Sequence, residues 1–283
     1  MNRHRIVRAP ASSANLGPGY DVLAAALSLE LELEVEETGE FSVVSDTDGV
    51  PLDRTNLCVR AFEKLHSADG LAFSIRSQIP PAGGLGSSAA CIVAGLAAAD
   101  HMFELDAPLF EPACELEGHP DNVAAALYGG FVICGPGDPV RIEPSEGLEG
   151  IIARPPAPVS TEQARAALPD QVPMTEASFN IGHASLLTLG LARSDFSLIG
   201  RGLDDRLHQP RRAALYPRSI ELLHRAREFG AIGATISGAG PSVLFWCQWQ
   251  TTGDVQSALK AAAPDCEVQR VNFAPGGVDV RDL

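Results

Sequence analysis

Hydrophobic and polar positions along the chain recur with two different periods, which predicts a mixture of strands and helices. Residues 22–35 run apolar and then alternate between aliphatic and acidic side chains, a pattern typical of a strand with one buried face. Residues 56–66 carry apolar side chains at helical spacing, and residues 89–100 are rich in alanine, which has the highest helix propensity. The same criteria predict strands at residues 5–7 (followed by a loop at 9–19), 41–45 (a partner of 22–35), 73–79, 130–134, 233–236, 242–248 and 266–271. They predict helices at residues 109–116, 123–127, 177–191, 196–206, 220–229 and 255–263.

The order of these elements indicates the fold class and a division of the chain. Strands and helices do not alternate strictly, so we expect an α+β fold rather than a parallel sheet of βαβ units. A chain of 283 residues suffices for two domains, and the sequence Arg-Pro-Pro-Ala-Pro at residues 154–158 is a plausible junction between them. We therefore expect one domain at residues 1–152 and a second at 153–283.

Composition narrows the classes of function. The formal net charge of −15 disfavours binding to nucleic acid, whose phosphates such a chain would repel. The six cysteines show no paired metal-site or disulfide spacing, so we expect a reduced, cytoplasmic protein. The first eight residues are polar and basic rather than signal-like, and no stretch reaches the ~18 apolar residues of a membrane span. No membrane association is expected.

The glycine-rich run at residues 80–90 is the most informative segment. Three glycines and two serines directly precede the alanine-rich helix. Glycine lets the backbone approach a ligand closely, and a helix start offers N–H groups to an anion, so the run predicts a phosphate cradle. A turn that merely caps the helix is the alternative. No lysine follows the last glycine, and Lys64 and Lys260 are the only lysines, so amides, Mg²⁺ or arginines would neutralise a phosphate.

Two further glycine loops, at residues 10–21 and 237–241, flank this run in sequence. Three such loops in this order resemble the GHMP small-molecule kinases. Four segments are similar to the homoserine kinases within that family: Ala-Pro-Ala-Ser-Ser-Ala-Asn-Leu-Gly-Pro-Gly-Tyr-Asp at 9–21, Glu-Gly-His-Pro-Asp-Asn-Val-Ala at 117–124, Ser-Thr-Glu-Gln-Ala-Arg at 160–165 and Leu-His-Gln-Pro-Arg-Arg at 207–212. The resemblance extends over about residues 7–245.

The resemblance implies a two-domain GHMP kinase fold, with an N-terminal nucleotide-binding α+β domain, a C-terminal ferredoxin-like α/β sandwich and a left-handed βαβ crossover. It implies ATP-dependent phosphorylation of the L-homoserine hydroxyl in threonine synthesis, with Mg²⁺, in a chain that forms a homodimer. Two alternatives remain: a kinase of the same family acting on another small hydroxy or amino acid, such as a mevalonate-like one, and a nucleotide-binding regulator without catalysis.

The resemblance also assigns residues to the nucleotide and the metal. The ATP-binding residues are Pro80, Pro81, Ala82, Gly83, Gly84, Leu85, Gly86, Ser87, Ser88, Ala89 and Ala90, together with Gly238 and Gly240 of the third loop. Asn56 is a candidate for the adenine pocket by its position alone. Ser87 or Ser88 would lie near Mg²⁺, and Glu117 is the preferred carboxylate ligand, with Glu115 as a rival.

The remaining assignments concern the acceptor and the transfer step. Asn15 and Asp21 would hold the substrate ammonium, although both residue types also favour turns in which they bond their own backbone. Arg165 and Arg212 would bind the substrate carboxylate through bidentate contacts, whereas Arg211 is interpreted as a solvated charge. His119, Asn122 and Thr161 would lie at the reacting hydroxyl. Asp121 would either accept the hydroxyl proton or orient its neighbours, and the orienting role is preferred.

Overall fold

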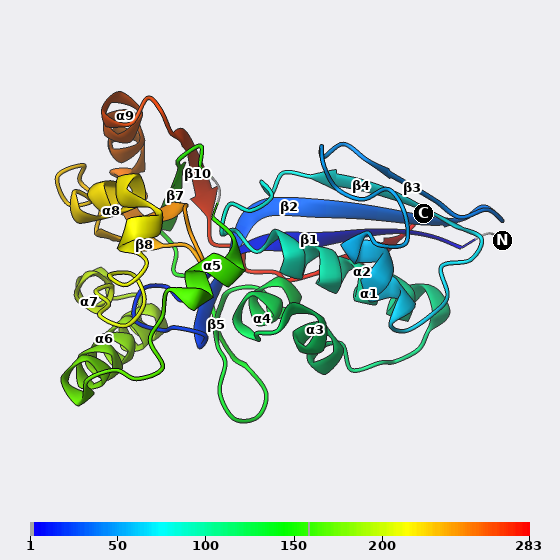
Figure 1. Ribbon diagram of the computed structural model, residues 1–283, viewed down its shortest axis with the longest axis horizontal. Helices are drawn as coiled ribbons and strands as arrows, with labels where there is room; N and C mark the ends of the chain where they lie inside the picture. Colours follow the sequence, from blue (N-terminus) through cyan, green and yellow to red (C-terminus); the bar gives the residue numbers. More distant parts are fainter. Residues whose placement is uncertain (1–2, 158) are drawn as a thin grey trace.

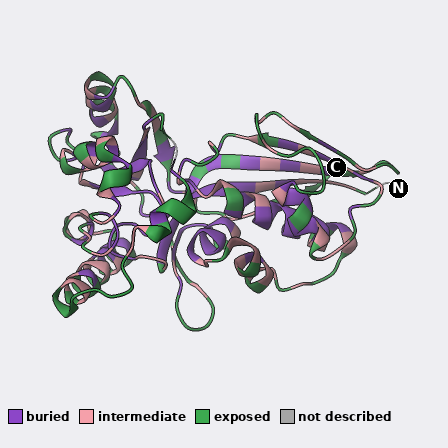
Figure 2. Cartoon of the chain, in the orientation of Figure 1, coloured by how far each residue is buried: buried purple, intermediate pink, exposed green. Residues whose placement is uncertain are grey.

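The computed structural model describes residues 3–157 and 159–283, and within them two β-sheets lie side by side along the long axis (Figure 1). In the described residues seven strands form the first sheet and four form the second. Helices α1 to α4 cover one face of the first sheet, and helices α5 to α9 surround the second (Figure 1). Buried residues concentrate where the helices meet the sheets (Figure 2). The expected α+β class is confirmed.

The first sheet is built around two long strands, β1 (His4–Ala14) and β2 (Leu23–Glu37). The aliphatic residues of β2 that alternate with glutamates, Leu31, Leu33 and Val35, are at most 1 % exposed, which confirms the period-two interpretation. The strand order is β11-β1-β2-β4-β3, and β2 also pairs with β5, which pairs with β6. The remaining bounds are β3 Ser42–Ser45, β4 Leu71–Ser77, β5 Phe131–Ile133, β6 Val140–Ile142 and β11 Asp279–Asp282.

Two predictions about this sheet were wrong. The segment 9–14, predicted as loop, continues β1, because its small residues pair with β2 as far as Ala14 opposite Ala24. Strand β3 pairs in parallel with β4 rather than with β2. Helix α1 (Leu57–Glu63) lies between β3 and β4 in the chain, so this parallel pair requires a crossover. Its left hand stays a prediction.

The helices on this sheet begin at its polar loops. Helix α2 (Ser87–Phe103) starts directly after Gly86, two residues earlier than predicted. Helix α3 (Phe110–Glu117) ends at Gly118, and α4 (Asp121–Tyr128) begins at Asp121 rather than at residue 123. The start of α2 and the start of α4 therefore both lie next to segments that the sequence assigned to the site.

The second sheet is antiparallel, with the order β10-β7-β9-β8. Its strands are β7 (Leu148–Arg154), β8 (Gly233–Ile236), β9 (Val243–Gln248) and β10 (Glu267–Asn272). Its helices are α5 Thr161–Ala166, α6 Met174–Arg193, α7 Phe196–Gly202, a 3-10 turn at Ala213–Leu215, α8 Pro217–His224 and α9 Thr252–Ala262. Strands β6, β7 and β11 and helix α5 were not predicted, and α7 and α8 end four or more residues before their predicted ends.

The predicted domain division after residue 152 stays a prediction. It falls within β7, and Pro158 of the predicted junction lies outside the described residues. Strand β11 returns to pair with β1, so both termini lie at the same end of the molecule (Figure 1).

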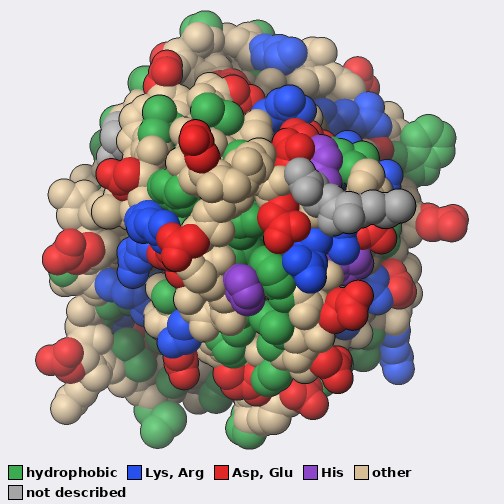
Figure 3. Space-filling model, turned by 90° about the vertical axis from the view of Figure 1, so that its right-hand side faces the viewer, with side chains coloured by type: hydrophobic (Ala, Val, Ile, Leu, Met, Phe, Trp, Pro, Cys, Tyr) green, Lys and Arg blue, Asp and Glu red, His purple; other side chains and the backbone are tan. Residues whose placement is uncertain are grey.

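The surface is mixed in charge despite the acidic composition. On the face at the free end of the first sheet, acidic and basic side chains are interspersed (Figure 3). Elsewhere on the same sheet basic side chains form ion pairs with acidic ones, as Arg8 does with Glu32. In the part of the chain that the structure describes, none of the helices has the length and apolar character that a membrane crossing requires.

Candidate active site

The three glycine loops meet around one cavity of about 360 Å³ between the two sheets. Ser237 Oγ donates to the Gly84 carbonyl at 2.6 Å, and the Gly238 amide donates to the Ala14 carbonyl at 3.1 Å, so loops far apart in sequence are in direct contact. Every residue predicted for the site lines this cavity except Ala89 and Ala90, which are fully buried within α2.

The central loop owes its shape to glycines at two positions. Gly84 and Gly86 have φ values of +73° and +68°, which non-glycine residues rarely adopt. A Cβ atom on Gly84 would lie 2.4 Å from the Ser237 carbonyl oxygen, and one on Gly86 would lie 2.0 Å from Ser12 Oγ. No described side chain caps the first turn of α2 at Gly86, so this turn presents its backbone N–H groups and the positive end of the helix dipole at the loop. The loop therefore fits an anionic ligand.

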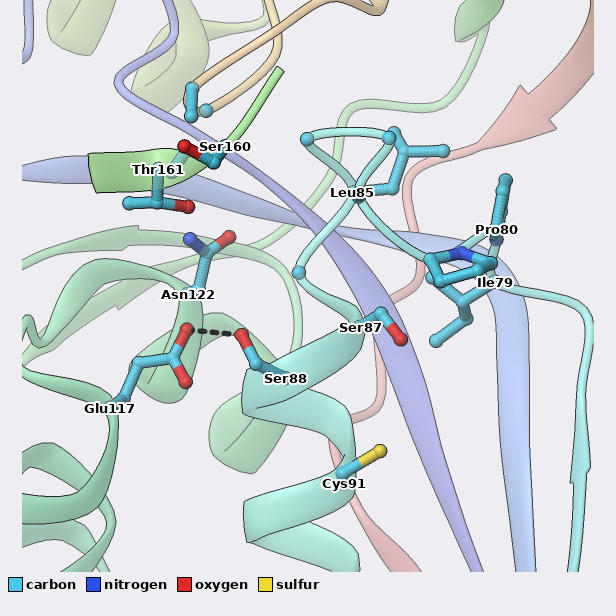
Figure 4. Close-up of a pocket in the computed structure, with 18 of the residues that line it drawn as sticks. Ile79, Pro80, Leu85, Ser87, Ser88, Cys91, Glu117, Asn122, Ser160 and Thr161 are labelled. Atoms are coloured by element: carbon cyan, nitrogen blue, oxygen red, sulfur yellow. Dashed lines mark hydrogen bonds between the residues drawn. The ribbon is translucent and has the colours of Figure 1, made fainter. Parts of the chain in front are cut away.

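An acid and a hydroxyl meet at the start of α2. Ser88 Oγ donates to Glu117 Oε1 at 2.6 Å, whereas Ser87 points away from Glu117 (Figure 4). Burial raises the pKa of Glu117, whose side chain is 7 % exposed. The rival Glu115 is exposed and pairs with Lys64 at 2.9 Å. Of the two acids, only Glu117 lines the cavity.

The segment after Glu117 forms a hydrogen-bonded cluster. His119 Nδ1 lies 2.8 Å from Asp121 Oδ1, which also accepts a hydrogen bond from the backbone N–H of Asn122 at 2.8 Å. Asn122 Oδ1 accepts from Ser12 Oγ at 2.8 Å, and its side chain lies beside Thr161 (Figure 4). Burial of the His119 ring opposes its charged form, but the hydrogen bond to Asp121 and the charges of Asp121 and Glu117 outweigh it, so the pKa of His119 is raised.

Opposite charges face each other in the cavity, where Asp21 meets Arg165. Arg165 Nη2 and Nη1 donate to the two carboxylate oxygens of Asp21 at 2.9 and 3.0 Å, and Nη1 also donates to the Tyr20 hydroxyl. The guanidinium carbon of Arg212 lies 5.3 Å from the centre of the Tyr20 ring, within the range of a cation–π interaction. Both arginines thus contact Tyr20 from the same cavity.

Asn15 adopts the turn geometry that the sequence left open. Its φ is +70°, its Oδ1 accepts the Asp21 amide at 3.0 Å, and its Nδ2 donates to the Gly238 carbonyl at 3.0 Å. Asn15 therefore shapes the first loop and ties it to the third.

The neighbouring arginines of the 207–212 segment differ in environment. Arg212 is 2 % exposed, and its Nε donates to the Ala164 carbonyl at 2.9 Å. Arg211, interpreted as a solvated charge, is partly exposed and lies outside the cavity lining, where it pairs with Glu176 and donates to the Leu207 carbonyl at 3.0 Å. No lysine is among the described residues that line the cavity.

Comparison with known families agrees with this geometry. Residues 56–130 match the family described as the GHMP kinases N terminal domain, and residues 187–265 match the one described as GHMP kinases C terminal. A homoserine kinase from Moorella thermoacetica is 38 % identical over 258 residues, which cover 86 % of this chain and 87 % of that protein. The chain belongs to the GHMP kinase family.

Other relatives of this GHMP kinase give the same result. A homoserine kinase from Gloeobacter violaceus is 39 % identical over 97 % of this chain and 98 % of that protein. The crystal structure of homoserine kinase from Cytophaga hutchinsonii superposes with a TM-score of 0.86 at 30 % identity, covering 99 % of this chain and 98 % of that one. A mevalonate diphosphate decarboxylase from Staphylococcus aureus, with a TM-score of 0.74 and 14 % identity, shares the fold alone. The predicted two-domain GHMP fold is thereby confirmed, and membership of this kinase family implies use of ATP.

Three groups of this GHMP kinase site escaped the sequence interpretation. Tyr20 was quoted within the first loop but given no role, Ser12 was read as loop, and His208 was noted only as part of a motif. Their contacts join segments far apart in the chain, so only the presence of all three residues in the quoted motifs could have pointed to them. Asn56, assigned to the adenine, lines the cavity and also caps α1, where its Oδ1 accepts the Cys58 amide at 2.9 Å. Its nucleotide role stays a prediction.

Proposed function

We propose that the chain phosphorylates the side-chain hydroxyl of L-homoserine with ATP, giving O-phospho-L-homoserine and ADP. The observation that carries this proposal is that Asp21, Arg165 and Arg212 line the same cavity as the phosphate loop. A carboxylate and two guanidinium groups suit the ammonium and carboxylate of an amino acid. The homoserine kinases among its relatives support the same acceptor.

The nucleotide phosphates would bind at the loop from Pro80 to Ser88. The amides of the loop and of the first turn of α2 would hold the phosphate oxygens without a lysine, because no lysine is among the described residues that line the cavity. Gly238 and Gly240 would close the cavity from the second sheet, since the third loop already contacts Gly84. Ala89 and Ala90 pack inside α2 and would support this loop rather than touch the nucleotide.

The residues present fit Mg²⁺. The Glu117 carboxylate and the Ser88 hydroxyl supply hard oxygen donors at one point of the cavity, beside the phosphate loop. Among the described residues no group of three or more His, Cys, Asp or Glu is arranged to hold a metal, which suits an ion that takes most of its ligands from phosphate and water. Ser88 replaces Ser87 as our proposed partner of Glu117. When bound, Mg²⁺ would neutralise charge on the phosphates.

The substrate would separate an existing ion pair. Asp21 would exchange Arg165 for the substrate ammonium, and Arg165 would exchange Asp21 for the substrate carboxylate. Arg212, held against Ala164 and the Tyr20 ring, would provide the second guanidinium. Asn15 would fix the loop that carries Asp21 rather than bind the ammonium alone.

The transfer step needs little from the protein beyond positioning and charge neutralisation. The homoserine oxygen bonds to the γ-phosphorus, the bond from that phosphorus to the ADP oxygen breaks, and the hydroxyl proton passes to an oxygen of the transferred phosphate and from there to water. Asn122 and Thr161, which both line the cavity, would orient the hydroxyl. Asp121 would act as an orienting group, because its Oδ1 already accepts from both His119 and the Asn122 amide.

A panel of acceptors in an ADP-release assay tests this proposal. L-homoserine is compared with L-serine, which is one methylene shorter, with 4-hydroxybutyrate, which lacks the ammonium, and with 3-aminopropanol, which lacks the carboxylate. Mevalonate represents the other small hydroxy acids. We expect L-homoserine to exceed each by at least about tenfold in kcat/KM, because each change removes a charged contact or shifts the hydroxyl. Turnover with L-homoserine no higher than with L-serine or mevalonate would contradict the proposal, and ATP binding without ADP release would favour a regulator. The cytoplasmic location and the homodimer remain predictions.

A further inference from the structure

His208 is fully buried, and its ring contacts both the first glycine loop and Arg212. Its Nε2 is 2.7 Å from the Gly17 carbonyl oxygen, and its Nδ1 is 3.3 Å from Arg212 Nη1. The two ring nitrogens therefore connect the loop that carries Asp21 to an arginine that lines the cavity.

The partners of the ring determine where its proton lies. A carbonyl oxygen only accepts and a guanidinium only donates, so Nε2 carries the proton toward Gly17 and Nδ1 accepts from Arg212. Asp205 Oδ2, 3.6 Å from Nε2, favours a proton on the same nitrogen. Burial lowers the pKa of His208 and the charge of Arg212 acts in the same direction, against the charges of Asp205 and Asp21 and the bond to Gly17. The guanidinium donor facing Nδ1 likewise requires the neutral ring. A charged ring would direct an N–H at the guanidinium and lose this bond.

A buried carboxylate fixes the backbone that carries the ring. Asp205 Oδ2 accepts the His208 and Gln209 amides at 3.0 and 2.7 Å, and Oδ1 accepts the Leu207 amide at 2.8 Å. Gln209 in turn accepts the Ile236 amide at 2.7 Å, next to the third glycine loop. The His208 ring is thereby held in register with both loops.

Arg212 receives its orientation from acceptors on three segments. Its Nη1 faces both His208 Nδ1 and the Gly238 carbonyl, each at 3.3 Å, and its Nε donates to Ala164. We propose that neutral His208, protonated on Nε2, is a positioning residue that directs the Arg212 guanidinium at the carboxylate of the acceptor. This inference rests on the proposed function for the identity of the acceptor, but the state of the ring can be measured without it.

Two isosteric variants separate the two halves of the ring. In His208→Asn the amide oxygen takes the place of Nδ1 and keeps an acceptor for Arg212, whereas the bond to Gly17 is lost. In His208→Gln the amide nitrogen takes the place of Nε2 and keeps the bond to Gly17, whereas Arg212 loses its acceptor. We expect the KM for L-homoserine to stay within about threefold of the parent value in H208N and to rise about tenfold or more in H208Q, with an unchanged KM for ATP in both. Equal effects of the two variants on the KM for L-homoserine, or a larger effect in H208N, would overturn the proposal.

A measurement on the unmodified protein covers variants that fail to fold. Nitrogen-15 NMR of the histidine side chains, with His208 assigned by comparison with either variant or by its slow exchange, reports which ring nitrogen is protonated. We expect a neutral ring with the proton on Nε2, and a proton on Nδ1 would refute the inference whether or not the protein turns over. Absence of turnover with L-homoserine in the parent enzyme would instead refute the proposed function and leave the tautomer to be read from the spectrum.

Discussion

Arg165 and Asp21 form a two-point ion pair in the lining of the cavity, with both Nη atoms within 3.0 Å of a carboxylate oxygen. The resemblance assigns the two residues to opposite ends of a zwitterion, and in the structure they pair with each other. An amino-acid substrate would thus exchange one set of charged contacts for another, which avoids leaving either charge unpaired in the partly enclosed cavity.

Asp21→Asn tests whether Asp21 recognises the substrate ammonium, separately from recognition of the substrate carboxylate. We expect kcat/KM for L-homoserine to fall about 10- to 100-fold, the range for loss of a hydrogen bond to a charged group. The kcat/KM for 4-hydroxybutyrate, which has no ammonium, should change little. The ratio of kcat/KM for L-homoserine to that for 4-hydroxybutyrate should therefore fall. Steady-state kinetics with both acceptors measure this ratio. Glu162→Gln, on the exposed side of α5, is the matched control. An equal loss of kcat/KM for both acceptors in D21N would show that Asp21 acts through Arg165 alone.

Glu117→Gln and Glu115→Gln form a second matched pair. Glu117 lies beside Ser88 at the phosphate loop, whereas Glu115 faces Lys64 outside the cavity. We expect E117Q to lower kcat about 100-fold or more and to raise the Mg²⁺ concentration needed for half-maximal rate, because a neutral amide binds Mg²⁺ weakly. E115Q should stay within about twofold, since exposed ion pairs contribute little. Equal Mg²⁺ dependence in the two variants would remove Glu117 from the metal site.

Glu117→Gln, which should lower activity, should not lower the stability of the fold. Burial raises the folded-state pKa of Glu117, so the unfolded chain ionises first as pH rises. The free energy of unfolding contributed by this group therefore falls between the unfolded pKa and the raised folded pKa, and glutamine avoids that loss. Without Mg²⁺ and ATP, we expect E117Q to unfold at a temperature equal to or above that of the parent at neutral pH. Calorimetry measures this, and a lower Tm would mean that the charged Glu117 holds the site together.

The sequence predicted the elements whose pattern is local and missed the features that depend on contacts between segments. The alternation of β2 and the alanine-rich α2 were read correctly because burial on one face leaves a period in the sequence. The continuation of β1 through Ala14 was missed, because small residues near a glycine loop give no strand signal until β2 pairs with them. The sequence could not tell which of two adjacent residues points into the site, because that depends on the direction each side chain takes from its helix or turn. Ser88 rather than Ser87 faces Glu117. Arg212 lines the cavity, whereas its neighbour Arg211 pairs with Glu176. Tyr20 gains its place only from α5 and the 207–212 segment packing around the first loop.

Asp121→Asn distinguishes a base from an orienting group. Asp121 Oδ1 accepts two hydrogen bonds, and an asparagine Oδ1 at the same place can accept both. If Asp121 only orients His119 and Asn122, kcat should fall less than about tenfold, because the geometry survives the loss of charge. Single-turnover measurements isolate the chemical step. A fall of about 1,000-fold or more at unchanged KM values would instead identify Asp121 as the proton acceptor.

His119 should make stability depend on pH in a defined window. Its pKa is raised by Asp121 and Glu117 against the effect of burial, so its contribution is fully present below the unfolded pKa and is lost as pH rises through the raised folded pKa. We expect the difference in the free energy of unfolding between the parent and His119→Gln to be larger at about pH 6 than at about pH 8.5. Denaturant titrations at the two pH values test this. A difference that grows with pH would show that burial outweighs the two carboxylates.

Gly84→Ala tests whether contact between the central and third glycine loops controls ATP binding. A Cβ at Gly84 would meet the carbonyl oxygens of Ser237 and Gly240 at 2.4 and 2.8 Å, both on the backbone, and the residue has φ +73°. Gly137 has a similar φ of +85° with nothing within 4 Å of its Cβ position, so Gly137→Ala carries the backbone strain of about 1–2 kcal/mol without the clash. We expect G84A to lose more stability than G137A, because the third loop must move away. The KM for ATP should rise about tenfold in G84A only, since loops that separate no longer enclose the phosphates. Thermal unfolding and ATP titrations of both variants measure the two effects. If G84A and G137A lose equal stability and bind ATP equally, contact between the two loops does not control ATP binding. Closure of the cavity by Gly238 and Gly240 is then excluded.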